Sequence, residues 1–227
     1  SKRELIQAFI CDGMTLKEAR KIPLKHLIEN NTRITSLTIK YNLNDDLQVI
    51  SSGLSNNTTL TRLCIIDKHF HTNRQNIITM TNILDLELEV YRLDQFTLIF
   101  MNNTNLNKLC IKTNYICNIG SLIENHKNLK ELIIDNVNHV YHNDAHHIFN
   151  LIFDALFKNA SITKLTYFNV ECPMFQINTT LKSLHIKSLF IRPDFSMTLK
   201  NNTTLEELVD YNYTRNCSYQ CYSKDMA

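Results

Sequence analysis

The sequence predicts an α/β solenoid in which repeated strand–turn–helix units stack into one parallel sheet. A short pattern, written apolar, two variable residues, apolar, one variable residue, apolar, recurs eight times along the 227 residues. It usually follows an Asn-rich polar turn, most clearly in segments 30–42, 56–65, 102–114 and 201–212. Several of the intervening segments carry apolar residues at helical spacing. A repeat of this length predicts a solenoid, because one unit cannot bury its apolar face alone.

The three apolar places of the pattern are called the first, fourth and sixth. The first places are Ile34, Leu60, Ile83, Leu106, Leu129, Ile162, Leu181 and Leu205. The fourth places are Leu37, Leu63, Leu86, Leu109, Leu132, Leu165, Leu184 and Leu208. The sixth places are Ile39, Ile65, Leu88, Ile111, Ile134, Tyr167, Ile186 and Asp210, the last of which departs from the pattern. Alternation with polar residues is typical of half-buried strands, so we expect eight parallel strands, and Asp210 indicates the end of the array.

Helical periodicity appears between some of the strands. Leu43, Leu47, Ile50 and Leu54 recur every three or four residues, and the segment 148–156 does so with Asp144 as a candidate N-cap. The segment 96–100 is a shorter version. The 33 residues from Leu129 to Ile162 leave room for an extra loop at about 135–143, whereas the 19 residues from Ile162 to Leu181 include Pro173 and predict an irregular or short helical turn.

These features resemble leucine-rich repeat proteins of the ribonuclease-inhibitor-like type. Segments 47–65 and 148–167 match that family's layout, in which a helix ends in Leu and a polar turn leads into a strand. The resemblance covers roughly 24–212. It implies a horseshoe with strands on the concave side, short irregular helices on the convex side, and varied protein partners. The Asn or Cys usual at the ninth place appears only at Asn42 and Asn114, and the chain has only three Gly, which indicates a diverged array with irregular turns.

The organisation that we expect is a helical cap at 1–23, a repeat domain at 24–212 and a C-terminal tail or cap at 213–227. No apolar run is long enough to span a membrane, and charged residues stand where a signal peptide would need its apolar core. Seven Cys without a regular pairing pattern favour reduced thiols in the cytoplasm. The Asn-, Ile- and Lys-rich composition is typical of an AT-rich genome such as that of a large DNA virus, in which case the compartment is the host-cell cytoplasm.

Charge is mixed on the variable third, fifth and seventh places of the strands. The basic residues there are Lys40, Arg62, Lys108, Lys112, Lys164 and Lys187, and the acidic ones are Asp85, Glu87, Glu89, Glu131, Asp135 and Glu207. This balance lacks the clustered basic footprint of nucleic acid binding. No Gly-rich phosphate loop, nucleophile elbow or HExxH motif is present, so we expect no catalytic residue, no cofactor and no small-molecule ligand.

The candidate site is the concave strand surface. Ile66, Ile133 and Phe168 are apolar residues at variable places, which favours contact with a partner. We expect them to act as anchors, and Glu87, Glu89, Lys108 and Lys112 to set orientation and specificity. The predicted function is therefore a non-enzymatic scaffold that binds a protein partner. Two alternatives stay open: a substrate-recognition subunit of a ubiquitin ligase, and a secreted or surface receptor repeat domain.

Three further motifs have a structural explanation that we favour. His139, His142, His146 and His147 with Asp144 have spacing that suits zinc, but a solvated insertion explains them better, and no metal site is expected. Cys217 and Cys221 lack further ligands, and their segment is expected to cover the end of the last strand. The N-x-S/T signals, including those at Asn57 and Asn159, are explained as the polar turn before each strand. Cys64 and Cys110 occupy fifth places and are expected on the concave surface.

Overall fold

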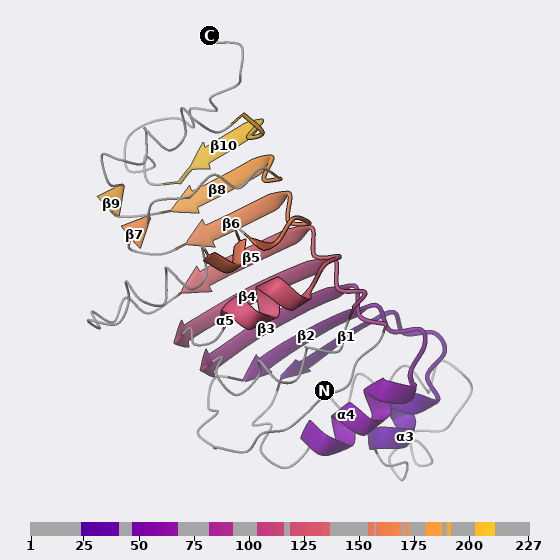
Figure 1. Ribbon diagram of the computed structural model, residues 1–227. Coiled ribbons are helices and arrows are strands. Elements are labelled where there is room, and N and C mark those ends of the chain that lie inside the picture. Colours follow the sequence, from indigo (N-terminus) through magenta and orange to yellow (C-terminus); the bar gives the residue numbers. More distant parts are fainter. Residues whose placement is uncertain are drawn as a thin grey trace.

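The computed structural model describes residues 24–40, 47–67, 82–92, 104–115, 119–136, 154–156, 158–168, 171–172, 180–187, 190–191 and 203–211. Eight strands form one parallel sheet in the order β1-β2-β3-β4-β5-β6-β8-β10 (Figure 1). They are β1 (Ser36–Lys40), β2 (Arg62–Asp67), β3 (Asp85–Arg92), β4 (Lys108–Tyr115), β5 (Glu131–Asn136), β6 (Lys164–Phe168), β8 (Ser183–Lys187) and β10 (Glu207–Asp210). With its few short helices the chain has the horseshoe architecture of leucine-rich repeats, and the predicted fold class is confirmed.

The register of the sheet follows the repeat pattern without a slip. The eight fourth-place leucines pair strand by strand in one row, from Leu37 on β1 to Leu208 on β10. The sixth-place residues form a parallel row, in which Tyr167 is fully buried. The first seven leucines of the fourth-place row are at most 4% exposed. The strand periodicity therefore identifies the face that forms the core.

Short helices precede or connect some of the strands. They are α3 (Leu24–Glu29), α4 (Leu47–Asn56) and α5 (Ile119–Asn125), and residues 154–156 are also helical. Helix α4 confirms one predicted helix, and residues 154–156 are the described end of the helix expected at 148–156. The expected strand–turn–helix unit implies a helix where α5 lies, although its seven residues are too few to give a periodic signal of their own. Figure 1 shows α5 lying across the sheet near β4 and β5.

A two-stranded parallel sheet, β7 (Glu171–Cys172) with β9 (Phe190–Ile191), follows the sixth and seventh repeats. This small sheet was not predicted; residues 173–179, within the interval where an irregular or short helical turn was expected, lie outside the described residues. The extra loop was expected at about 135–143, but residues 135 and 136 belong to β5. The rest of that loop, the expected cap at 1–23, the helix at 96–100, the histidine cluster at 139–147 and the tail at 213–227 also lie outside the described residues.

The helices α3 and α4 pack closely at Gly53. A Cβ atom at this position would lie 2.9 Å from Cβ of Ile28 and 3.0 Å from the carbonyl oxygen of Lys25. Real Cβ atoms do not approach other atoms so closely, so the absence of a side chain at Gly53 sets the distance between the two helices.

The Asn-rich turns are cross-linked from one repeat to the next. Oδ1 of Asn57 accepts hydrogen bonds from the N–H groups of Thr59 at 3.0 Å and Leu60 at 2.7 Å. Its Nδ2 donates to the carbonyl oxygens of Ile28 at 2.7 Å and Asn31 at 3.0 Å in the preceding repeat. The hydroxyl of Thr59 also donates to the carbonyl of Asn31, at 3.0 Å.

Asn159 repeats this arrangement four strands later. Its Oδ1 accepts from the N–H groups of Ser161 and Ile162, and its Nδ2 donates to the carbonyl of Ile123 at 2.7 Å. The hydroxyl of Ser161 donates to the carbonyl of Leu129 at 2.8 Å. Asn57 and Asn159 are each 4% exposed. At these two turns the N-x-S/T signal is explained by hydrogen bonds that satisfy buried backbone groups.

Candidate functional site

The surface opposite the buried leucine row is called the concave face and consists of the third, fifth and seventh places. Three rows of side chains cross it, and neighbouring members of a row are separated by the strand spacing of about 4.8 Å. The third-place row is Ser36, Arg62, Asp85, Lys108, Glu131, Lys164, Ser183 and Glu207. The fifth-place row is Thr38, Cys64, Glu87, Cys110, Ile133, Thr166, His185 and Val209. The described side chains at seventh places are Ile66, Glu89, Lys112, Asp135, Phe168 and Tyr211.

All seven residues predicted to bind a partner lie on this face. Ile66, Ile133 and Phe168 are half-buried, and Leu132 and Ile134 on either side of Ile133 are fully buried. Ile133 on β5 and Phe168 on β6 come from neighbouring strands, whereas Ile66 lies on β2, beyond β4 and β3. The structure therefore brings two of the three expected anchors together and leaves the third apart.

The charged residues predicted to orient a partner are engaged within the chain. Glu87 accepts a hydrogen bond from Nζ of Lys112 at 2.7 Å and pairs with Nη2 of Arg62 at 3.8 Å. The hydrogen bond to Glu87 raises the pKa of Lys112 above its usual range. Glu131 is bound from both sides, by Lys108 at 2.9 Å and by Lys164 at 3.7 Å. Partly exposed pairs of this kind are worth about 0–1 kcal/mol each, so a partner can displace them at little cost.

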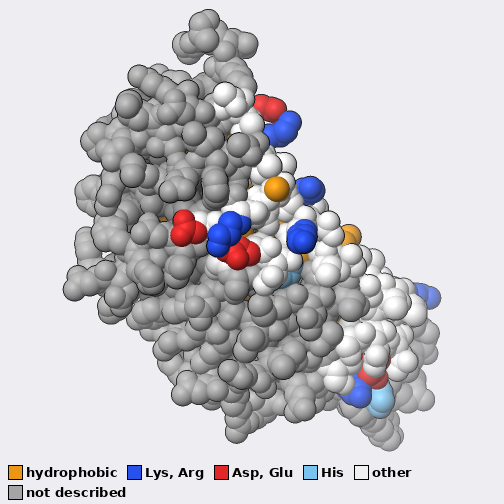
Figure 2. All heavy atoms as spheres, in the orientation of Figure 1, with side chains coloured by type: hydrophobic (Ala, Val, Ile, Leu, Met, Phe, Trp, Pro, Cys, Tyr) orange, Lys and Arg blue, Asp and Glu red, His pale blue; other side chains and the backbone are white. Residues whose placement is uncertain are grey.

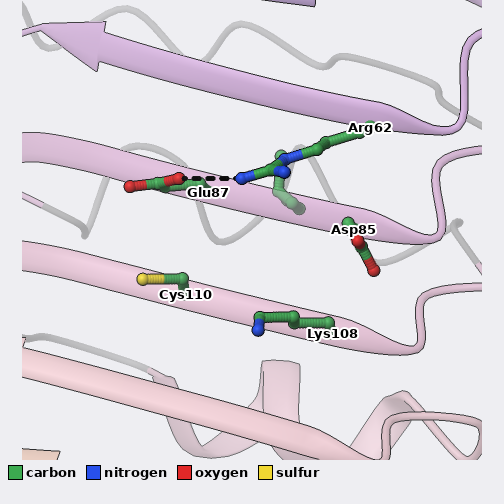
Figure 3. A pocket seen from close by; sticks show the side chains of 6 residues that line it. Arg62, Asp85, Glu87, Lys108 and Cys110 are labelled. Carbon is green, nitrogen blue, oxygen red and sulfur yellow. Dashed lines mark ion pairs between the residues drawn. The ribbon is translucent and has the colours of Figure 1, made fainter. Parts of the chain in front are cut away.

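A small cavity of about 70 Å³ opens on the concave face over β2, β3 and β4. It is lined by Arg62, Asp85, Leu86, Glu87, Lys108 and Cys110, and Figure 3 shows Glu87 directed toward Arg62. Cavities that bind drug-sized ligands are several times larger, at roughly 300–1,000 Å³. This hollow suits the end of one side chain of a partner better than a whole small molecule.

The two cysteines of the concave face are protonated thiols. Cys110 is only 8% exposed, so the expectation that it shows on the surface is wrong, whereas Cys64 is half-buried. Burial, with a contribution from the Glu87 carboxylate, raises the pKa of Cys110 to about 11 and also raises that of Cys64. A thiol must lose its proton to act as a nucleophile, so neither cysteine is activated for catalysis.

A polar and aromatic cluster on β6, β8 and β10 was not singled out from the sequence. The rings of Phe168 and Tyr211 meet edge to face, with centroids 5.3 Å apart. Nδ1 of His185 lies 3.2 Å from the Tyr211 hydroxyl, and Nε2 lies 3.2 Å from a carboxylate oxygen of Glu207. Hydrogen bonds from Ser183 and then His185 lower the pKa of Glu207. Row position could have revealed the cluster, because these polar residues occupy third and fifth places.

Leu84 is a further residue that the sequence pattern did not single out. It is 44% exposed at the second place of its repeat, on the rim beside Asp85, and is the most exposed large apolar side chain among the described residues. The second place was treated as variable, so nothing in the pattern drew attention to it.

Charges on the side of the molecule seen in Figure 2 are interspersed. Among the described residues there, Lys and Arg side chains lie singly or next to acidic ones, and neither sign gathers in a patch. Within the described ranges no three His, Cys, Asp or Glu side chains are grouped to hold a metal ion. The helices in the same ranges are too short and too polar to cross a membrane.

Comparisons with known proteins complete the description. No family model matches the chain, and no curated protein matches it. Solved structures that match include one described as leiomodin-1 actin-binding site 2, with 17% sequence identity and a TM-score of 0.40. The match covers 60% of this chain and 87% of that one. A likeness this distant leaves the function to be argued from the chain's own surface.

Proposed function

We propose that the chain is a non-enzymatic leucine-rich repeat scaffold that binds a protein partner through its concave face. The observation that carries the proposal is the half-exposure of Ile66, Ile133 and Phe168 at variable places of the sheet. Apolar side chains at positions that a solvated strand would fill with polar residues favour a surface that becomes buried on association.

The rigidity of the sheet supports this proposal. Each strand is paired in register with its neighbours, and the turns before β2 and β6 are fixed by the hydrogen bonds of Asn57 and Asn159. Side chains presented from such a surface lose little conformational freedom on binding. A partner therefore meets a preorganised platform rather than a surface that must fold around it.

Two finer proposals accompany the scaffold function. Helices between strands, as at α4 and α5, support the ribonuclease-inhibitor-like type of repeat and a repeat domain at 24–212. Cys64 and Cys110 are free thiols on strands separated by β3, and about 10 Å is too far for a disulfide between them. Free thiols support a cytoplasmic location.

The test is a quantitative affinity purification with the wild-type chain and Ile133→Glu as baits, followed by reconstitution with the purified partner. Burying a new carboxylate should abolish binding, while circular dichroism shows an unchanged fold. Lys127→Glu, an exposed change in the turn before β5, is the control and should bind as the wild type does. Equal binding of a reconstituted partner by Ile133→Glu and wild type would refute the concave-face proposal.

A further inference from the structure

Most charges on the concave face are already neutralised by a neighbour. Glu87 holds Lys112 and Arg62, and Glu131 holds Lys108 and Lys164. A partner's charged group gains little at these positions unless it breaks an existing pair. A carboxylate that remains available on this face is therefore where a partner's cation is stabilised most.

Asp135 is such a carboxylate. It is half-buried at the seventh place of β5, and its register partner on β4 is Lys112. Lys112 forms no ion pair with Asp135, because its ammonium group lies 2.7 Å from the Glu87 carboxylate. The carboxylate of Asp135 makes no ion pair or hydrogen bond with any residue that the structure describes. A half-buried carboxylate without such a bond is incompletely compensated for its lost hydration.

The other neighbour of Asp135 is an aromatic ring. Phe168 is its register partner on β6, about 4.8 Å away at the backbone, and is half-buried. The ring is fixed by its edge-to-face contact with Tyr211, and the Tyr211 hydroxyl lies 3.2 Å from Nδ1 of His185. Ile133, two residues before Asp135 on the same strand, adds apolar surface. A carboxylate, an aromatic ring and an aliphatic side chain are thus adjacent on one face.

We propose that Asp135, Phe168 and Ile133 form a subsite for an arginine or lysine side chain of the partner, flanked there by apolar residues. The inference rests on the proposed scaffold function and specifies its partner. The aliphatic stem packs on Ile133, and the cationic head lies against the Phe168 ring and bonds to the Asp135 carboxylate. Arginine fits better than lysine, because its planar guanidinium both stacks on a ring and forms paired hydrogen bonds.

A second concave carboxylate provides a matched control. The carboxylate of Asp85 on β3 also makes no ion pair or hydrogen bond with a described residue. Its register partners are the cations Arg62 and Lys108, and no aromatic ring adjoins it in the sheet. A partner's cation is repelled there, so Asp85→Asn removes the same charge from the same face without removing the subsite.

The experiment selects displayed random peptides on the full chain and measures the affinity of selected peptides for purified variants. The selected peptides should carry arginine or lysine next to apolar residues. Asp135→Asn should weaken their binding about tenfold or more, and Phe168→Leu should also weaken it, whereas Asp85→Asn should change it by no more than about twofold. Replacing the arginine of a peptide by uncharged citrulline should cause the same loss, with no further loss in Asp135→Asn.

Each other outcome counts against a defined statement. If Ile133→Glu abolishes binding but Asp135→Asn does not weaken it, the scaffold function stands and the cation subsite is wrong. The subsite is also wrong if the selected peptides lack basic residues. If selection yields no binder, or if the selected peptides bind Ile133→Glu as tightly as the wild type, both the scaffold proposal and the subsite are overturned.

Discussion

Lys112 on β4 bonds diagonally to Glu87 on β3, with 2.7 Å between Nζ and Oε1, although its register partner on that strand is Glu89. The pair is partly exposed, at 37% and 25% of the two side chains. Lys112→Met should therefore lower the free energy of unfolding by less than about 1 kcal/mol. Urea denaturation at neutral pH measures this loss.

The pH dependence of the Lys112–Glu87 pair has a defined sign. The pKa of Lys112 is raised in the folded chain, so the pair's contribution is fully present below the unfolded value of about 10.4 and is lost as pH rises through the folded value. The stability difference between wild type and Lys112→Met should shrink in that alkaline range. A difference that stays constant there would contradict the assignment.

Cys110 should react slowly with thiol reagents. Its pKa of about 11 against an ordinary value of 9.0 lowers the thiolate fraction near neutral pH about a hundredfold. Alkylation followed by mass spectrometry should label Cys64 before Cys110 in the folded chain, and both at similar rates in urea. Preferential labelling of Cys110 without denaturant would contradict the burial of its side chain.

Asn57→Ala should destabilise the chain by about 2–4 kcal/mol. The change removes three bonds that the Asn57 side chain accepts and two that it donates, and it leaves buried backbone groups without partners. Asn56→Ala is the matched control, because Asn56 is exposed and its Nδ2 donates a hydrogen bond to the Glu29 carboxylate at 2.9 Å. That variant should lose less than about 1 kcal/mol.

Gly53→Ala should destabilise the chain, against the intrinsic preference of helices. In an open helix this change stabilises by about 0.5–1 kcal/mol. Here the new Cβ would meet Ile28 at 2.9 Å, and overpacking costs about 1–3 kcal/mol. The sign of the shift in thermal midpoint decides between the two effects, and an increase would mean that α3 and α4 are not so tightly packed.

Leu132→Ala and Ile133→Ala compare adjacent residues on opposite faces of β5. Leu132 is fully buried, so its truncation should cost about 2–5 kcal/mol. Ile133 is half-exposed, and its truncation should cost about 1 kcal/mol or less while weakening partner binding. Similar losses of stability for the two variants would contradict the assignment of the faces.

The rows of the sheet could be predicted because strand periodicity is local and exact. Placing Leu63 inside also places Cys64 and Glu87 outside, and neighbouring repeats then align through their leucines. The bounds of helix α5 could not be predicted, because its seven residues are too few for a periodic signal. The β7–β9 sheet depends on pairing between two-residue segments 19 residues apart, from Glu171 to Phe190, which no local pattern encodes.

The candidate site was predictable in position but not in electrostatics. The sequence places Glu87, Lys108 and Lys112 on one face, and all three lie there. The sequence does not specify the side-chain rotamer of Lys112, which pairs its ammonium group with Glu87 rather than with Glu89 or Asp135. The availability of Asp135 follows from that choice. The burial of Cys110 depends likewise on its surroundings in the folded sheet, not on its alternation along β4.

The hydrogen bonds of the Asn57 and Asn159 turns bear on how such a chain can change in length. In both repeats the asparagine precedes the first-place residue by the same short interval and bonds to the turn before it, so this stretch tolerates neither insertion nor deletion. The intervals between successive first places, by contrast, range from 19 residues (Ile162 to Leu181) to 33 residues (Leu129 to Ile162). Repeats can therefore differ in length through insertions or deletions outside these turns, and a whole unit can be duplicated or lost, while the rows of the concave face keep their spacing.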